Sequence, residues 1–90
     1  MTHTTPRPNQ LMEKRLLDAA GALGELSSMR VEVLNIDLSQ AIPLLSVRPN
    51  QVLKESTNAS TRSRRGTGDK RIEVKRSTIA RCFVEWEVQP

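Results

Sequence analysis

Apolar side chains recur between residues 10 and 27 with the spacing of a helical face. Asn9 precedes them and can accept a backbone hydrogen bond as an N-cap. We therefore predict a helix from Gln10 to about Ser27. Gly21 and Gly24 lower its helix propensity and would let it lie close to a sheet. The predicted buried face follows an i, i+3, i+4, i+7 pattern and consists of Met12, Leu16, Ala19, Ala20, Leu23 and Leu26.

Two strands are predicted after this helix, over residues 30–38 and 42–48. In the first, the apolar positions change phase between Val33 and Leu34, which predicts a β-bulge there. In the second, Pro43 cannot donate a ladder hydrogen bond, so we expect an edge strand or one-sided pairing at that position. The short connection between the two strands favours an antiparallel hairpin.

The clearest strand pattern lies near the end of the chain, where Ala80, Cys82, Val84, Trp86 and Val88 alternate with mostly polar residues. Residues 71–75 alternate in the same way, with Ile72 and Val74 inward, and Ser77-Thr78 allows a turn or bulge between the two strands. Residues 54–65 contain almost no apolar side chain and fit either a loop or a polar strand. Residues 66–69 carry a turn signal.

Together these elements predict an α+β fold, with one N-terminal helix packed on a four- or five-stranded antiparallel meander. Residues 1–8 are expected to form a disordered arm. Residues 9–90 are expected to form a single domain with a basic loop or hairpin at about residues 55–71.

Composition limits the class of protein further. The chain has 90 residues, of which 37% are hydrophobic, and a single cysteine. It has no apolar run long enough to span a membrane and no apolar segment of a signal peptide near residue 1, so we expect a cytoplasmic protein. One cysteine cannot staple the fold through an internal disulfide, which suits a reducing compartment.

Positive charge is concentrated in one segment of the chain. Residues 62–81 carry eight bases and two acids, a net charge of +6, whereas the rest of the chain carries −2. A segment of this kind attracts phosphate groups or acidic protein surfaces over roughly 8–10 Å, and its alternative interpretation is a solvated loop. The predicted partner-binding residues, which flank the expected turn and would gather at a hairpin tip, are Arg62, Arg64, Arg65, Lys70 and Arg71. No aromatic residues are interleaved with these bases, so any contact with nucleic acid would be mostly to its backbone.

Catalysis is not expected, nor is a metal or cofactor. The only histidine, His3, lies in the expected disordered arm, and Cys82 belongs to the apolar face of the last strand. One histidine and one cysteine cannot form a structural zinc site. Ile79 and Phe83 lie on the other side of the predicted last strand, where they either cover a second small layer or form a partner or dimer surface.

Four segments resemble those of short phage and prophage proteins of unknown function: residues 16–20, 31–36, 42–48 and the ending Cys82-Phe83-Val84-Glu85-Trp86. The resemblance implies a mobile-element context, in which small proteins such as anti-CRISPR proteins bind host machinery. We therefore expect a non-enzymatic protein of a bacterial host's cytoplasm that binds a host protein or nucleoprotein complex stoichiometrically. The alternatives are direct binding of nucleic acid and a structural role in a phage assembly.

Overall fold

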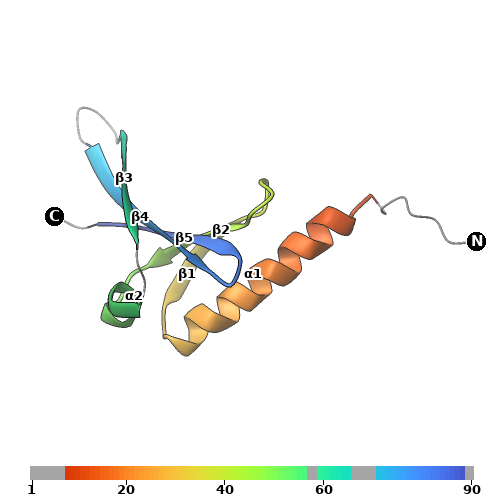
Figure 1. Ribbon diagram of the computed structural model, residues 1–90, viewed down its shortest axis with the longest axis horizontal. Coiled ribbons are helices and arrows are strands. Elements are labelled where there is room, and N and C mark those ends of the chain that lie inside the picture. The colour runs from red at the N-terminus through yellow and green to blue at the C-terminus, as the bar shows by residue number, and fades with distance from the viewer. Residues whose placement is uncertain (1–7, 57–58, 66–70, 89–90) are drawn as a thin grey trace, which may run out of the picture.

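The computed structural model describes residues 8–56, 59–65 and 71–88, and it confirms the α+β class. An N-terminal helix is followed by five strands and one further short helix (Figure 1). The expected arm lies outside the described residues except for Pro8. In chain order the elements are α1 (Gln10–Ser28), β1 (Glu32–Asp37), β2 (Leu44–Arg48), α2 (Gln51–Ser56), β3 (Ser60–Arg65), β4 (Arg71–Ile79) and β5 (Cys82–Glu87).

The five strands form one sheet with the order β1-β2-β5-β4-β3. Three neighbouring pairs are antiparallel, but β2 and β5 run parallel, with Leu45 opposite Val84. The predicted simple meander is therefore wrong in this respect, because the last strand inserts beside β2 instead of remaining at an edge. Two fully buried side chains, Leu45 and Val84, meet in that pairing, which places the strongest apolar strand at the centre of the sheet.

The hairpin of β1 and β2 is antiparallel, as predicted, and its register shifts between Val33 and Asn35, which confirms the predicted bulge. Of the two alternatives for Pro43, the edge strand is wrong and one-sided pairing at that position is confirmed, because the β1–β2 pairing ends at Leu44 and Pro43 bonds only toward β5. The strand that follows it lies inside the sheet, and Pro43 itself is buried just before the first strand residue, Leu44. Its missing N–H removes nothing from the ladder there, and its carbonyl accepts a hydrogen bond of 2.9 Å from the Phe83 N–H.

One face of the sheet carries the hydrophobic core. The second half of α1 and the short helix α2 cover this face. The buried residues of the cluster are Ala22, Leu26, Val31, Leu45, Val47, Leu53, Cys82, Val84 and Trp86. The alternation predicted for the last strand is confirmed for Cys82, Val84 and Trp86, which are buried in turn. Ala80 is instead exposed in the turn before the strand, and Val88 follows its last residue.

Helix α1 ends in a Schellman motif, in which Arg30 occupies the left-handed position with φ of 60°. The Arg30 N–H bonds to the Ser27 carbonyl at 3.0 Å, and the Val31 N–H bonds to the Leu26 carbonyl at 2.9 Å. Val31 and Leu26 are both buried, so the hydrophobic contact typical of this cap joins the helix end to the core.

The predicted buried face of α1 is only partly correct. Ala19 and Leu26 are buried and Ala22 joins them, whereas Leu16 is 52% exposed and Leu23 39% exposed. For Leu16 the reason is visible in Figure 1, where the first half of α1 extends beyond the sheet and has no layer to pack against. Leu23 belongs to the second half of α1 but lies to one side of the buried Ala19, Ala22 and Leu26. The two helix glycines do not serve a close approach to the sheet, because an added Cβ at either would meet no atom within 4 Å.

Helix α2 was not predicted, and the side chain of Asn50 explains its position. The Asn50 Oδ1 accepts a hydrogen bond of 2.9 Å from the Leu53 N–H, which caps the start of α2. Its Nδ2 donates to the carbonyls of Met29 and Arg30 at 3.0 and 3.2 Å. One side chain thereby joins the end of α1 to the start of α2, while Leu53 is buried in the core.

The turn or bulge that Ser77-Thr78 was expected to allow does not occur, since both residues pair regularly with β5. Strand β4 continues to Ile79, which pairs with Cys82, and the chain reverses at Ala80 and Arg81. Both turn residues have positive φ, 49° and 68°, as type I′ hairpin turns require. Neither is a glycine or asparagine, and the turn therefore has no sequence signature.

Candidate basic β-ribbon

Strands β3 and β4 form a two-stranded antiparallel ribbon that ends the sheet, with β3 as the edge strand (Figure 1). Arg62 is paired with Val74, Arg64 with Ile72 and Arg65 with Arg71. Four of the five predicted partner-binding residues thus belong to two neighbouring, paired strands. Lys70 and the expected turn at residues 66–69 lie outside the described residues. We call this segment, β3 with the start of β4, the basic ribbon.

The spacing of the basic ribbon concentrates its cationic residues. Residues along a strand are about 3.3 Å apart and neighbouring strands about 4.8 Å apart, so four arginine Cα atoms lie within roughly 10–12 Å of one another. In the register, the nearest acidic position is Glu73, paired with Ser63. Arginine is the residue type suited to phosphates or carboxylates, which accept bidentate hydrogen bonds from it, and four arginines fall within this short stretch of paired backbone.

Two other bases of the positive segment are placed differently. Arg76 donates from Nε to the Glu85 Oε2 at 2.6 Å, and its guanidinium lies 4.8 Å from the centroid of the Phe83 ring. This ion pair neutralises Arg76 on the sheet face that points away from α1. Arg81 is exposed at the β4–β5 turn, at the opposite end of β4 from Arg71. The basic ribbon is therefore the segment in which the arginines lie closest together along paired backbones.

The structure places Ile79 and Phe83, the two residues of the second predicted surface, on opposite faces of the sheet. Ile79 pairs with Cys82 and packs against the core, whereas Phe83 pairs with Thr78 and lies beside Arg76 on the other face. The expected common face depended on the incorrect turn position, since the observed turn begins only after Ile79. Sequence reasoning missed the Arg76–Glu85–Phe83 cluster for the same reason, because that cluster depends on the β4–β5 register.

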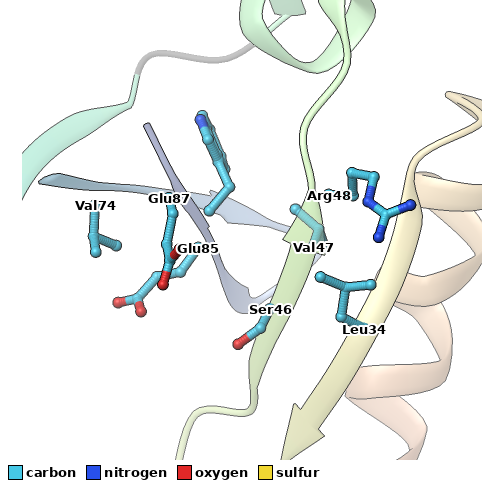
Figure 2. Close-up of a pocket in the computed structure, with 8 residues that line it drawn as sticks. Leu34, Ser46, Val47, Arg48, Val74, Glu85 and Glu87 are labelled. Atoms are coloured by element: carbon cyan, nitrogen blue, oxygen red, sulfur yellow. The ribbon is translucent and has the colours of Figure 1, made fainter. Parts of the chain in front are cut away.

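An open depression of about 350 Å³ lies on the face of the sheet away from α1, and Figure 2 shows its lining. Val74 and Leu34 supply apolar surface, and Ser46, Glu85 and Glu87 supply oxygen atoms. Glu85 is already neutralised by Arg76, so the depression lacks a concentration of charge comparable with that of the basic ribbon. The basic ribbon remains the principal candidate site.

Cys82 is fully buried, as predicted from its place on the apolar face. Burial raises the pKa of the Cys82 thiol, and the negative charge of Asp18 adds to the effect. Both influences oppose formation of the thiolate, which is the nucleophilic form. Among the described residues, no group of three or more histidine, cysteine, aspartate or glutamate side chains is arranged to hold a metal ion.

Comparison with known proteins does not assign the chain to a family. No family model matches it, and neither a curated protein nor a solved structure gives a match. In the part of the chain that the structure describes, neither helix is long and apolar enough to cross a membrane. A function must therefore be argued from the geometry of the basic ribbon.

Proposed function

We propose that this chain is a small, non-enzymatic binding protein whose basic ribbon holds an acidic surface of a larger partner. The observation that carries the proposal is the β3–β4 register, which sets Arg65 opposite Arg71 and Arg64 opposite Ile72 in an edge ribbon. Like charges held this close repel one another unless anions neutralise them, and a polyanionic partner supplies such anions.

We propose a host protein or nucleoprotein complex in the cytoplasm of a bacterial cell as the partner. The resemblance to short phage proteins supports this choice, since such proteins act on host machinery by stoichiometric binding. A defence complex, which combines acidic protein surface with nucleic acid, has the required chemistry. In this proposal the protein works as an inhibitor or accessory subunit, in the manner of an anti-CRISPR protein.

Direct binding of nucleic acid is the second candidate, and the shape of the site favours it. A two-stranded antiparallel ribbon fits the major groove of duplex DNA, and β3–β4 is such a ribbon at a free edge of the sheet. Contacts would be mainly to phosphates, because arginines at four positions supply charge and no aromatic side chain lies among them.

Charge reversal tests the shared part of both proposals. The variant Arg62→Glu/Arg64→Glu/Arg65→Glu is compared with Lys14→Glu/Lys54→Glu/Arg81→Glu, which changes the net charge equally at exposed positions elsewhere. Tagged forms of the parent and both variants are used for affinity purification from a bacterial lysate, with and without nuclease. We expect one set of partners in fixed stoichiometry with the parent and the control, and loss of that set with the ribbon variant.

Salt dependence separates the two partner classes. Binding to a random-sequence DNA duplex should be weak at physiological salt if the partner is a protein or nucleoprotein. If naked DNA is the partner, log affinity should fall with log salt by about 0.9 per phosphate neutralised, and the ribbon variant should flatten the slope by roughly 2–3 units. Retention of all partners and of the full salt slope by the ribbon variant would show that the basic ribbon is only a solvated segment.

A further inference from the structure

The face of the sheet that points away from α1 carries an aromatic side chain on the central strand β5. Both helices pack on the opposite face, where the core lies (Figure 1). Phe83 pairs with the exposed Thr78 of β4, and its half-buried ring lies on the uncovered face. The chain's other large aromatic side chain, Trp86, is buried in the core. Phe83 is therefore the aromatic ring that this face offers to a partner.

Arg76 is held over this ring by two contacts. The central carbon of its guanidinium lies 4.8 Å from the centroid of the Phe83 ring, and its Nε donates a hydrogen bond of 2.6 Å to the Glu85 Oε2. The side chains of Arg76 and Glu85 are only 24% and 14% exposed. A long side chain that is already fixed in this way loses little further conformational freedom when a ligand binds. Arg76 and Phe83 thus form a preformed pair of planar groups, which we call the stacking pair.

The stacking pair lies beside the basic ribbon. Arg76 pairs with Ser60, the first residue of β3, and Arg62 and Arg64 follow two and four residues later, about 7 and 13 Å along that strand. Glu85 balances the charge of Arg76, so the stacking pair supplies planar surface, whereas the ribbon supplies positive charge. A charged path for phosphates next to a planar surface for bases is the combination that single-stranded nucleic acid requires.

We propose that a single-stranded nucleic acid binds to this face, with its phosphates along the basic ribbon and one base stacked on the Arg76–Phe83 pair. The inference rests on the nucleic-acid part of the proposed function and adds the form of the strand. Bases inside a duplex are stacked on one another, so only an unpaired strand can bring the face of a base to the stacking pair. A guanidinium plane and a phenyl ring accept any base, and we therefore expect little sequence preference.

Comparison of two oligomers isolates the contribution of the base. Fluorescence anisotropy measures binding of a labelled strand of about 12 thymidine nucleotides and of an abasic strand with the same number of phosphates. We expect the parent protein to bind the thymidine strand about tenfold more tightly, because the abasic strand can contact only the ribbon.

Substitutions in the stacking pair test its role directly. Phe83→Leu keeps an apolar side chain, and Arg76→Lys keeps the positive charge beside Glu85 but removes the guanidinium plane. Each should reduce the ratio of the two affinities to about one, without a change in the salt dependence of binding. Arg48→Lys is the matched control, since Arg48 forms its ion pair with Glu32 on the first hairpin, and it should keep the parental ratio. Circular dichroism confirms that each variant folds.

The outcomes separate this inference from the proposed function. Equal affinity of the parent for both oligomers, or a parental ratio in Phe83→Leu and Arg76→Lys, would overturn the stacking pair but would leave the basic ribbon as a phosphate-binding segment. Tighter binding of a duplex than of the single strand would also overturn the inference. If neither oligomer binds, the nucleic-acid part of the proposed function fails together with it, and a protein partner remains.

Discussion

Trp86 and Val84 occupy the centre of the core on the central strand β5, with exposed fractions of 4% and 0%. Truncation of Trp86 to alanine leaves a large cavity and should lower the free energy of unfolding by about 3–5 kcal/mol. Val84→Asp buries an unpaired carboxylate and should prevent folding. Urea denaturation followed by circular dichroism measures both effects, and Leu34→Ala, at an exposed position, should change the stability by less than about 0.5 kcal/mol. A parental urea midpoint for Trp86→Ala would contradict the assigned core.

Cys82 gives the fold a pH dependence with a definite sign. Because the pKa of this thiol is raised in the folded state, the unfolded chain ionises first, near its ordinary value of about 8.5. The stability linked to Cys82 is therefore complete below that pH and decreases as the pH rises above it. Comparison of thermal unfolding between pH 7 and about pH 10 should show a smaller decrease for Cys82→Ala than for the parent.

The same residue should also react slowly with a thiol reagent in the native protein, since it is fully buried. Denaturant should bring labelling to the rate of a free thiol. Rapid labelling under native conditions would mean that the strand around Cys82 opens readily. In the pH experiment, an equal decrease in stability for the parent and Cys82→Ala would show that other groups cause the loss of stability at alkaline pH.

Strand β5 and the bulge in β1 could be predicted because both depend on local alternation of apolar residues, which burial on one face of a sheet imposes directly. The buried face of α1 was predicted less well. Its apolar residues span a wider arc than the sheet covers, so Leu16 and Leu23 fit the pattern yet remain exposed. The periodicity of a helix shows which residues favour burial but does not show how far a neighbouring layer extends.

Helix α2 and the parallel pairing of β2 with β5 could not be predicted locally. The helix has six residues, too few for a periodic pattern, and its position depends on Asn50 and the distant end of α1. The parallel pairing joins segments almost 40 residues apart. At the candidate site, the arginine cluster was visible in the sequence, whereas the pairing of Arg76 with Glu85 followed from a turn without a turn signature.

Asn50 connects two helices, and this role predicts graded effects of substitution. Asn50→Ala removes the cap of α2 and both donors to the α1 carbonyls, so we expect a loss of about 1–3 kcal/mol in unfolding free energy. Asn50→Asp keeps an acceptor for the Leu53 N–H but sets a carboxylate against the Met29 and Arg30 carbonyls. It should therefore also destabilise the protein. Because this variant keeps the cap, its loss of stability measures the contribution of the connection to the end of α1.

Chemical denaturation of the two Asn50 variants measures their effects. Gln51→Ala serves as the control, because the described hydrogen bond of the Gln51 side chain stays within α2, to Glu55, and both residues are exposed. A fully stable Asn50→Asp would indicate that the cap alone accounts for the contribution of this side chain.

At the scale of the whole molecule, the basic ribbon and the first half of α1 lie in different regions. The basic ribbon ends the sheet on the side of β3, and α1 extends past the sheet beyond β1 and β2 (Figure 1).

The central position of β5 makes the sheet depend on it as a unit. Without residues 82–90, β2 and β4 lose their shared neighbour and the core loses Cys82, Val84 and Trp86. We predict that a chain of residues 1–81 shows no cooperative thermal transition by circular dichroism, and that a synthetic peptide of residues 82–90 restores one. A cooperative transition in the shortened chain alone would show that the two hairpins are stable separately.

The strand order also has a consequence for synthesis on the ribosome. Translation makes β1, β2, β3 and β4 before β5, yet β5 is the strand that holds the two hairpins together. Until β5 is made and pairs, the new chain displays the unpaired inner edge of β2, which can pair with other chains. Chaperone binding to this edge would therefore determine how much of the newly made protein reaches its native state.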